Sequence, residues 1–357
     1  MPLADPAPEA RPPVGPPTAG RPGALVISLD FELLWGVRDL FPPGGGAYAA
    51  HLRGARAAVP AMLDLFARYD VRATWSTVGL LFAEGPADRA RFDPTVRPAY
   101  ADAGLDPYAE AVGEGEADDP LHHAPGLVDA ILAAPGQELG THTYGHIYAL
   151  EPGMTAEAFR ADLASAVAIA RHRGATVRSV VFPRNQVDAR LLPALREAGL
   201  VAYRGTPAAW MYRAEAFGAE GLLKRAARLL DAHLPLTDLT AGWDDLDAAD
   251  GLVNVRGTAF LRPLSGRVAA DRLHTRRLLG GLTAAAERGR IFHLWWHPHN
   301  FGVRTAEHLD RLEQILDRFA TLRRLTGMTS ETMESAALAV LGPAPATRGP
   351  SPPARRP

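Results

Sequence analysis

Short apolar runs that alternate with amphipathic helical segments constrain the fold of this chain more than any other feature. The first run, ALVISL at 24–29, is aliphatic, contains β-branched residues and is followed by Asp30 and Glu32. Runs of this kind form strands that are buried on both faces. Apolar residues at helical spacing follow at 55–69, and a second strand is expected at 72–77. This strand–helix–strand order predicts a parallel sheet with helices outside it.

The same alternation continues toward the C-terminus. Further strands are expected at 138–142, 179–182, 201–203 and 291–296, with helices at 126–134, 156–173, 189–198, 271–288 and 305–321. The segment 205–255 has no clear period. We expect an α/β fold: one irregular (β/α) barrel of about seven parallel strands over 24–336, with an insertion near 84–120. The Pro-rich ends, 1–23 and 337–357, are expected to be disordered tails.

The composition excludes several classes of protein. A formal net charge of -2 gives no basic excess for nucleic-acid binding. With no cysteine in the chain, a metal must be held by His, Asp or Glu. No apolar run approaches the roughly 18 residues of a transmembrane helix. The N-terminal segment lacks the apolar core of a secretory signal, so we expect a cytoplasmic protein. The sequence does not indicate an oligomeric state.

Polar residues follow several of the expected strands. In barrels of parallel strands the active site gathers at the C-terminal ends of the strands, so these residues are the candidates for chemistry. They are Asp30 and Glu32, His142 and His146, Arg184 and Asn185, and His297, His299 and Asn300.

His142 and His146 are four residues apart, a spacing that lets two imidazoles bind one divalent ion. Such a pair also occurs as surface or hydrogen-bonded histidines. A carboxylate from another strand end would complete a site of two histidines and one acid, which leaves a coordination position open for water. Asp30 and Glu32 are both available for this, although each could also be a cap or a turn residue.

Several segments resemble the polysaccharide deacetylases, the NodB homology domain of carbohydrate esterase family four. The resemblance runs from about 24 to 300. Its most specific segment is QELGTHTYGH at 137–146, and the others are SLDFE at 28–32, RATWSTVGLLF at 72–82, VVFPRN at 180–185 and HLWWHPHN at 293–300. It implies an irregular barrel that uses one divalent ion, usually zinc, to remove acetyl groups from amino sugars.

Roles for individual residues also follow from the resemblance. It makes Asp30 the general base, His142 and His146 metal ligands, and His297 the general acid. The first motif here is Asp-Phe-Glu rather than two adjacent aspartates, so Glu32 is the expected third ligand. The third motif is Phe-Pro-Arg-Asn, so Arg184 is expected to orient the base.

The remaining expectations concern the substrate. Trp35 is a candidate wall of the binding site, and the backbone N–H of Tyr144 is a candidate for holding the oxyanion. Asn185 and His299 are candidate substrate contacts. The family's fourth motif, which supports the acidic histidine, has no secure counterpart; the candidates are Trp243, Asp244, Asp245 and Arg262.

The function expected from these residues is hydrolysis of an acetyl group from an N- or O-acetylated sugar or glycoconjugate intermediate. Metal identity stays open, because histidine and carboxylate ligands suit several divalent ions. Two alternatives remain. One is an amidohydrolase that acts on a small cyclic amide, as relatives of this barrel do with allantoin. The other is a non-catalytic carbohydrate-binding relative that kept the barrel.

Overall fold

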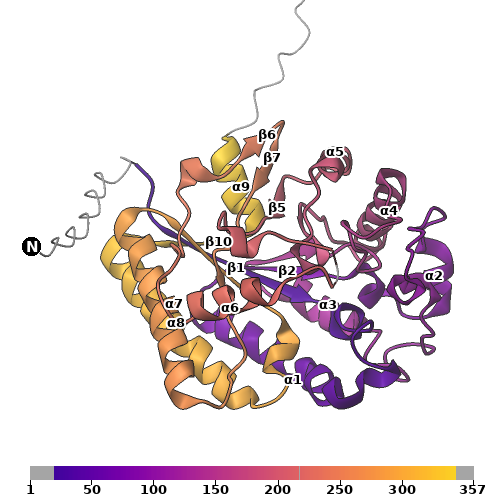
Figure 1. Ribbon diagram of the computed structural model, residues 1–357, viewed down its shortest axis with the longest axis horizontal. Coiled ribbons are helices and arrows are strands. Elements are labelled where there is room, and N and C mark those ends of the chain that lie inside the picture. The colour runs from indigo at the N-terminus through magenta and orange to yellow at the C-terminus, as the bar shows by residue number, and fades with distance from the viewer. Residues whose placement is uncertain (1–19, 217, 343–357) are drawn as a thin grey trace, which may run out of the picture.

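The computed structural model describes residues 20–216 and 218–342 of the chain. A largely parallel sheet lies at the centre, with helices outside it (Figure 1). The strands are β1 (Ala24–Phe31), β2 (Ala73–Thr77), β3 (Gln137–Thr141), β4 (Ser179–Val181), β5 (Ala202–Arg204), β6 (Ala248–Ala249), β7 (Leu252–Asn254), β8 (Ala259–Phe260), β9 (Ile291–Trp296) and β10 (Thr329–Glu331). The expected α/β class is confirmed.

The α-helices of the described residues are α1 (Ala49–Arg68), α2 (Pro86–Phe92), α3 (Pro125–Ala133), α4 (Ala156–His172), α5 (Leu192–Glu197), α6 (Leu222–Asp231), α7 (Val268–Arg288), α8 (Thr305–Thr326) and α9 (Met333–Leu341). Six of them, α1, α3, α4, α5, α7 and α8, match the segments with helical spacing in the sequence, whereas α2, α6 and α9 are not predicted by it. The segment 84–120 holds α2 and two short 3-10 turns. None of the described helices is both long and apolar enough to cross a membrane.

The sheet has the order β6-β7-β5-β4-β3-β2-β1-β9-β8, and every pair in it is parallel except β6 with β7. One bent segment bridges its two sides. The N–H of Val255, just after β7, donates to the carbonyl of Tyr203, and the N–H of Thr258, just before β8, donates to that of His293. Residues 252–261 therefore contact both β5 and β9, so the largely parallel strands curve into a ring that is not strictly closed.

The interior of the ring changes from apolar to polar along β1. Side chains at alternate positions of a strand share one face, so Ala24, Val26, Ser28 and Asp30 lie on the same side of β1. Ala24 and Val26 belong to a buried apolar cluster that includes residues of α9, and α9 lies against β1, β5 and β7. The helix thus covers the end of the ring where the strands begin. The polar residues of this face, Ser28 and Asp30, lie toward the opposite end, where the strands finish.

Helix α9 crosses the expected domain boundary near the C-terminus. The helix runs to Leu341, past the expected boundary at 336, because its small residues Ala336 and Ala337 are fully buried against the strands. Residues 1–19 and 343–357, which hold most of the two expected tails, lie outside the described residues.

Candidate metal centre and active-site cavity

A buried ion pair lies at the C-terminal end of the ring. Asp30, near the end of β1, accepts hydrogen bonds from two nitrogens of Arg204, the last residue of β5, each at 2.7 Å. Arg204 also donates to Ser28 at 2.9 Å and to Asn185 at 3.0 Å, and its guanidinium lies 4.2 Å from the ring centre of Trp295. Both charged side chains are almost completely buried. These contacts fix the carboxylate in one orientation.

The charges around Asp30 keep it ionised. Burial by itself would raise its pKa, but the Arg204 guanidinium, with His142 and His297 nearby, holds the pKa of Asp30 below its ordinary value. A buried carboxylate without such a partner would prefer its neutral form. Asp30 therefore offers two oxygens that can accept a proton at neutral pH.

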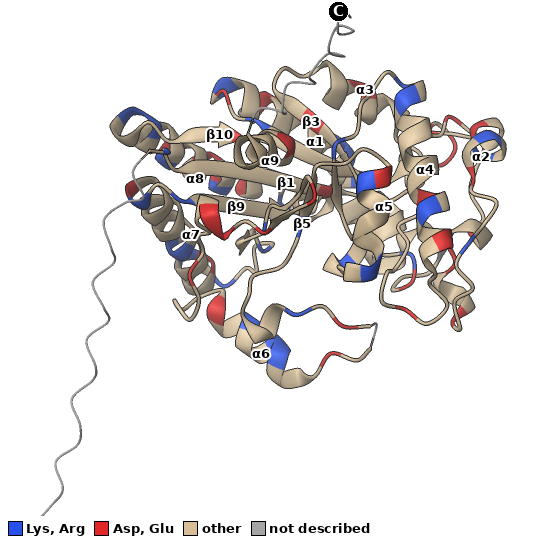
Figure 2. Ribbon diagram, turned by 90° about the horizontal axis from the view of Figure 1, so that it is seen from above, with Lys and Arg blue, Asp and Glu red and all other residues tan. Residues whose placement is uncertain are grey.

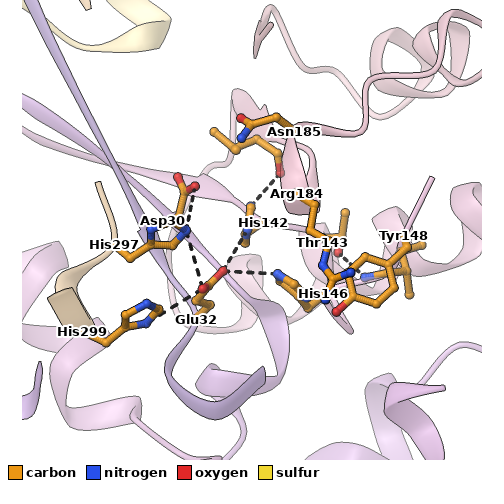
Figure 3. Close-up of polar contacts among 12 residues, drawn as sticks. Asp30, Glu32, His142, Thr143, His146, Tyr148, Arg184, Asn185, His297 and His299 are labelled. Carbon is orange, nitrogen blue, oxygen red and sulfur yellow. Dashed lines mark hydrogen bonds and ion pairs between the residues drawn. The ribbon is translucent and has the colours of Figure 1, made fainter. Parts of the chain in front are cut away.

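Glu32, His142 and His146 form a second cluster beside the first. One oxygen of the Glu32 carboxylate lies 3.2 Å from Nε2 of His142 and 3.2 Å from Nε2 of His146. The ligand-type atoms of all three residues lie within 4.8 Å of one another, and all three side chains are buried. Figure 3 shows the two imidazoles directed at the Glu32 carboxylate.

The donor set of this cluster fits a divalent cation. Nδ1 of His142 lies 2.8 Å from the carbonyl oxygen of Val181, so the ring proton belongs on Nδ1. Nε2 of His142 then carries a lone pair that is directed at an oxygen of the Glu32 carboxylate. Both atoms are acceptors, so a cation between them would satisfy both. A tetrahedral ion with bonds of about 2.0–2.2 Å spaces its ligand atoms by roughly 3.3–3.5 Å, close to the distances seen here.

The protonation states also suit a metal site. Burial would raise the pKa of Glu32, but the neighbouring His297, His142 and His146 hold it well below its ordinary value. Burial lowers the pKa of His146 to about 4, although Glu32 opposes this. A carboxylate and neutral imidazoles are the forms in which these groups bind metal.

Local backbone structure places the two histidines. The N–H of His142 donates to the carbonyl of Thr77 at 2.9 Å, which continues the β2–β3 pairing past the end of β3. Beyond it, the Asp162 carboxylate on α4 accepts from the N–H groups of Tyr144 at 2.7 Å and Gly145 at 3.0 Å. Thr143 and His146 have φ values of 65° and 55°, so the turn is tight and left-handed at both. The sharp turn brings His146 back to the side of His142.

Two further histidines come from the segment after β9. Nε2 of His297 lies 3.7 Å from an oxygen of Asp30 and 3.7 Å from an oxygen of Glu32, and its side chain is partly exposed. His299 is buried, stacks on the His297 ring at 5.0 Å, and has Nδ1 3.9 Å from Glu32. Burial lowers the pKa of His299 to about 3. His297 is thus the histidine that both reaches the carboxylates and meets solvent.

The structure corrects the expected role of Arg184. Its guanidinium pairs with Asp39 and lies 4.6 Å from the ring centre of Tyr148, whereas the partner of Asp30 is Arg204. Arg184 has a φ of 54°, and this left-handed backbone directs its side chain toward Asp39. Sequence reasoning ended the strand at Tyr203 and so missed Arg204. For the other strands, the candidate is the first polar residue at the strand end. The same rule applied to β5 would have identified Arg204.

Three expected substrate contacts prove to be buried residues. Trp35 is 1% exposed and donates its indole N–H to the carbonyl of His122 at 2.9 Å, so it cannot form a wall of an open site. The N–H of Tyr144 is already bound by Asp162, which leaves it unable to hold an oxyanion. His299 is a buried neighbour of Glu32, where it stacks on His297, rather than an exposed contact.

The candidates for the fourth motif do not support His297. Trp243 donates to the carbonyl of Pro22, and Asp245 caps the short helix that contains Trp243. The rings that contact His297 are instead those of Phe260, Trp295 and His299, at centroid distances of 5.9, 5.8 and 5.0 Å. No local sequence pattern indicates this arrangement, because the three rings come from the ends of two neighbouring strands.

A cavity of about 710 Å³ opens beside His297. Asn185, Trp295 and His297 line it on the side of the strands. Its other walls come from the poorly patterned segment 205–232 and from α7. Cavities of this size hold molecules the size of a small drug or a short sugar. Of the proposed catalytic and ligand groups, His297 lines the cavity, and Asp30 and Glu32 lie behind it, each with an oxygen 3.7 Å from Nε2 of His297.

Comparison with known proteins agrees with the architecture. The model of the polysaccharide deacetylase family matches residues 52–203. No curated protein matches the chain in sequence. A solved structure from Mycobacterium smegmatis, described as a polysaccharide deacetylase, is similar with a TM-score of 0.56 at 15% identity, over 92% of this chain and 94% of that one.

Two more solved structures share the fold. One is from Pseudomonas aeruginosa PAO1 and is also described as a polysaccharide deacetylase; its TM-score is 0.52 at 14% identity, over 88% of each chain. The other is Puue allantoinase, with a TM-score of 0.50 at 13% identity, over 92% of this chain and 97% of that one. At such identities the likeness concerns the fold.

Proposed function

From the match of residues 52–203 to the polysaccharide deacetylase family, we propose that this chain is a metal-dependent hydrolase that removes an acetyl group from an N- or O-acetylated sugar or glycoconjugate. The observation that carries the proposal is the placement of a carboxylate–histidine–histidine cluster within reach of a buried aspartate and a partly exposed histidine. Glu32, His142 and His146 would hold one divalent ion, with zinc the expected metal. When bound, such an ion polarises the acyl carbonyl and makes water easier to deprotonate.

The residues of the chain supply proton transfer and orientation. Asp30 would accept a proton from the attacking water, since its pKa is held low and it is ionised. Arg204 would keep the carboxylate directed at that water through its two hydrogen bonds. His297 would donate a proton to the leaving nitrogen or oxygen as the carbon–heteroatom bond breaks. The products are acetate and a free amine or hydroxyl.

The geometry around His297 supports its role as the acid. Nε2 lies 3.7 Å from an oxygen of Asp30 and 3.7 Å from an oxygen of Glu32. His297 also lines the cavity, so its proton can reach a bound substrate. Asn185, which also lines the cavity, is proposed to contact the sugar.

A release assay with purified protein tests the proposal. Acetate would be measured from N-acetylglucosamine, its oligomers and an O-acetylated sugar, after loading with zinc or cobalt. Asp30→Asn removes the base while preserving the shape of the side chain, and should abolish release. If no acetylated compound is hydrolysed by the loaded wild type, the deacetylase function is rejected.

A cyclic amide is the competing substrate. The likeness to Puue allantoinase in fold favours this reading, and the same base and acid would serve an amide bond within a ring. Ring opening of allantoin and of a cyclic imide should be measured with the same preparations. Opening without any acetate release would establish the amidohydrolase. Sugar binding without hydrolysis of either class would support a non-catalytic relative.

A further inference from the structure

Arginine dominates the lining of the candidate active-site cavity. Six arginines and three carboxylates contribute to it. The arginines are Arg184, Arg213, Arg225, Arg228, Arg262 and Arg277, and the carboxylates are Glu215, Glu220 and Asp231. The chain as a whole has a formal net charge of -2, so this cationic lining is a local feature.

Most of these charges are neutralised within the wall. Glu220 pairs with both Arg225 and Arg228, and Asp231 pairs with Arg277 at 2.7 Å. Outside the lining, Asp39 neutralises Arg184. Glu215 is likewise held by Lys224. The carboxylates near the cavity are therefore already occupied.

Two arginines of the lining, Arg213 and Arg262, have no such partner among the described residues. Arg213 is exposed, so solvent screens its charge. The guanidinium of Arg262 has neither an ion pair nor a hydrogen bond to another described side chain. The residue is half-buried. Burial lowers its pKa; Tyr212 acts in the opposite direction and the charge of Arg228 in the same direction. Placing an unpaired charge in such a position is unfavourable unless an anion from outside the chain pairs with it.

The position of Arg262 relates this charge to the catalytic groups. It lies two residues after Phe260, and the intervening Leu261 is buried and donates its N–H to the carbonyl of Trp295 at 2.9 Å. Phe260 and Arg262 therefore lie on the same face of this extended segment, about 6–7 Å apart along it. The Phe260 ring lies 5.9 Å from that of His297. Arg262 thus follows His297 and Phe260 along one wall of the cavity.

We propose that Arg262 binds a phosphate group of the substrate while the acetyl group lies at His297, so that the substrate class is an acetylated sugar phosphate or phosphodiester. This inference rests on the proposed deacetylase function. A planar guanidinium can donate two parallel hydrogen bonds to a phosphate, which gives orientation as well as affinity. A neutral polysaccharide would leave this charge unpaired.

The side chains of helix α6 indicate whether the substrate that carries the phosphate is soluble or linked to a lipid. Its Arg228 and Asp231 line the cavity, while Leu222 and Leu223 are 81% and 74% exposed. Figure 2 shows α6 at the edge of the molecule. Exposed apolar side chains beside an anion site suit a lipid-linked sugar phosphate, although a sugar nucleotide offers the same phosphate chemistry. The experiment therefore needs both forms.

The test compares kcat/KM for acetate release from N-acetylglucosamine 1-phosphate with that from N-acetylglucosamine. Arg262→Gln should lower the value for the phosphate roughly 10- to 100-fold, the loss of a charge-assisted hydrogen bond, and leave the neutral sugar nearly unchanged. Arg262→Lys, which keeps the charge, should lose less. Arg272→Gln, an exposed arginine of α7 outside the cavity lining, is the matched control. Equal activity toward both sugars in the wild type would overturn the proposal.

A binding measurement separates this inference from the catalytic one. Titration calorimetry with N-acetylglucosamine 1-phosphate, on chelator-treated protein, excludes phosphate binding through an ion. Binding by the wild type that is lost in Arg262→Gln supports the phosphate site even if no acetate is released. Acetate release with no phosphate preference and no such binding rejects the phosphate site alone. The kcat/KM for a prenyl-linked N-acetylglucosaminyl phosphate in phosphatidylcholine vesicles is then compared with that for the soluble compound. A higher value for the prenyl-linked compound indicates a lipid-linked substrate, and a lower value indicates a soluble one.

Discussion

Arg204 donates from two guanidinium nitrogens to the two carboxylate oxygens of Asp30, both at 2.7 Å, in the buried interior of the ring. The contact joins the C-terminal ends of β1 and β5. It takes the place of the expected pairing between Asp30 and Arg184, and it makes Arg204 the residue on which the ionisation of the proposed base depends.

Loss of Arg204 should therefore shift the pH dependence of activity. The folded-state pKa of Asp30 lies below its ordinary value, so the base and the stability it contributes persist until the pH falls through that low pKa. In Arg204→Met, burial is unopposed and the pKa of Asp30 rises. The acidic limb of the kcat/KM profile should move to higher pH, and the protein should lose about 3–5 kcal/mol of stability.

Arg184→Gln is the control for this prediction, since it removes a guanidinium that pairs with Asp39. Its acidic limb should stay where the wild type has it. A shift in Arg184→Gln and none in Arg204→Met would restore the original assignment.

The ligand cluster predicts metal content. Wild-type protein should bind about one divalent ion per chain by elemental mass spectrometry, and Glu32→Gln and His146→Gln should each lose it. Chelation should lower the thermal midpoint by roughly 5–10 °C, and added zinc should restore it. His233→Ala, a partly exposed histidine of the loop after α6, is the matched control. Full metal content in Glu32→Gln would exclude Glu32 as a ligand.

The role of His297 can be separated from that of the metal. His297→Asn should retain the ion but lower acetate release from an N-acetyl sugar about 10²–10⁴-fold, the usual contribution of a general acid. An aryl acetate with a good leaving group needs little protonation, so its hydrolysis should fall much less. Equal losses for both substrates would mean that His297 acts in binding or in an earlier step.

Asp162 should control the turn that carries the two histidine ligands. Its carboxylate accepts from the N–H groups of Tyr144 and Gly145 and from the hydroxyl of Tyr108. Asp162→Asn leaves one oxygen in place of two, so a buried donor loses its partner at a cost of about 1–3 kcal/mol. Urea unfolding should report this loss, together with weaker zinc affinity. Unchanged affinity in a destabilised variant would limit Asp162 to stability.

Buried histidines should make the protein sensitive to acid. Burial lowers the pKa of His274, His293 and His308 to about 4, 3 and 4, from an ordinary value of 6.5. These side chains take up protons near pH 6.5 when unfolded but only at lower pH when folded, so stability falls as the pH drops from about 6.5 toward 4. Urea unfolding of metal-free protein at pH 7 and pH 5 measures this. His308 lies on α8 and is not part of the ligand cluster, so His308→Gln should reduce the pH dependence of stability without removing a ligand.

Local sequence patterns predicted most of the central strands, six of the described helices and the residues at most strand ends. Burial imposes a local period on a strand or helix, so apolar spacing identified β1, β9 and α4 without knowledge of their neighbours. The same reasoning placed Asp30, Glu32, His142, His146 and His297 at one end of a parallel sheet, because parallel strands all end on the same side.

Only the tertiary structure decided which side chains meet. Whether Arg184 or Arg204 holds Asp30 depends on a left-handed turn after β4 and on the packing of β5 beside it. Trp35 is buried because its ring meets the backbone of His122, far along the chain. The cavity and its unpaired Arg262 arise where 205–232, α7 and the end of β9 come together. Such contacts join residues distant in sequence, so no local period encodes them.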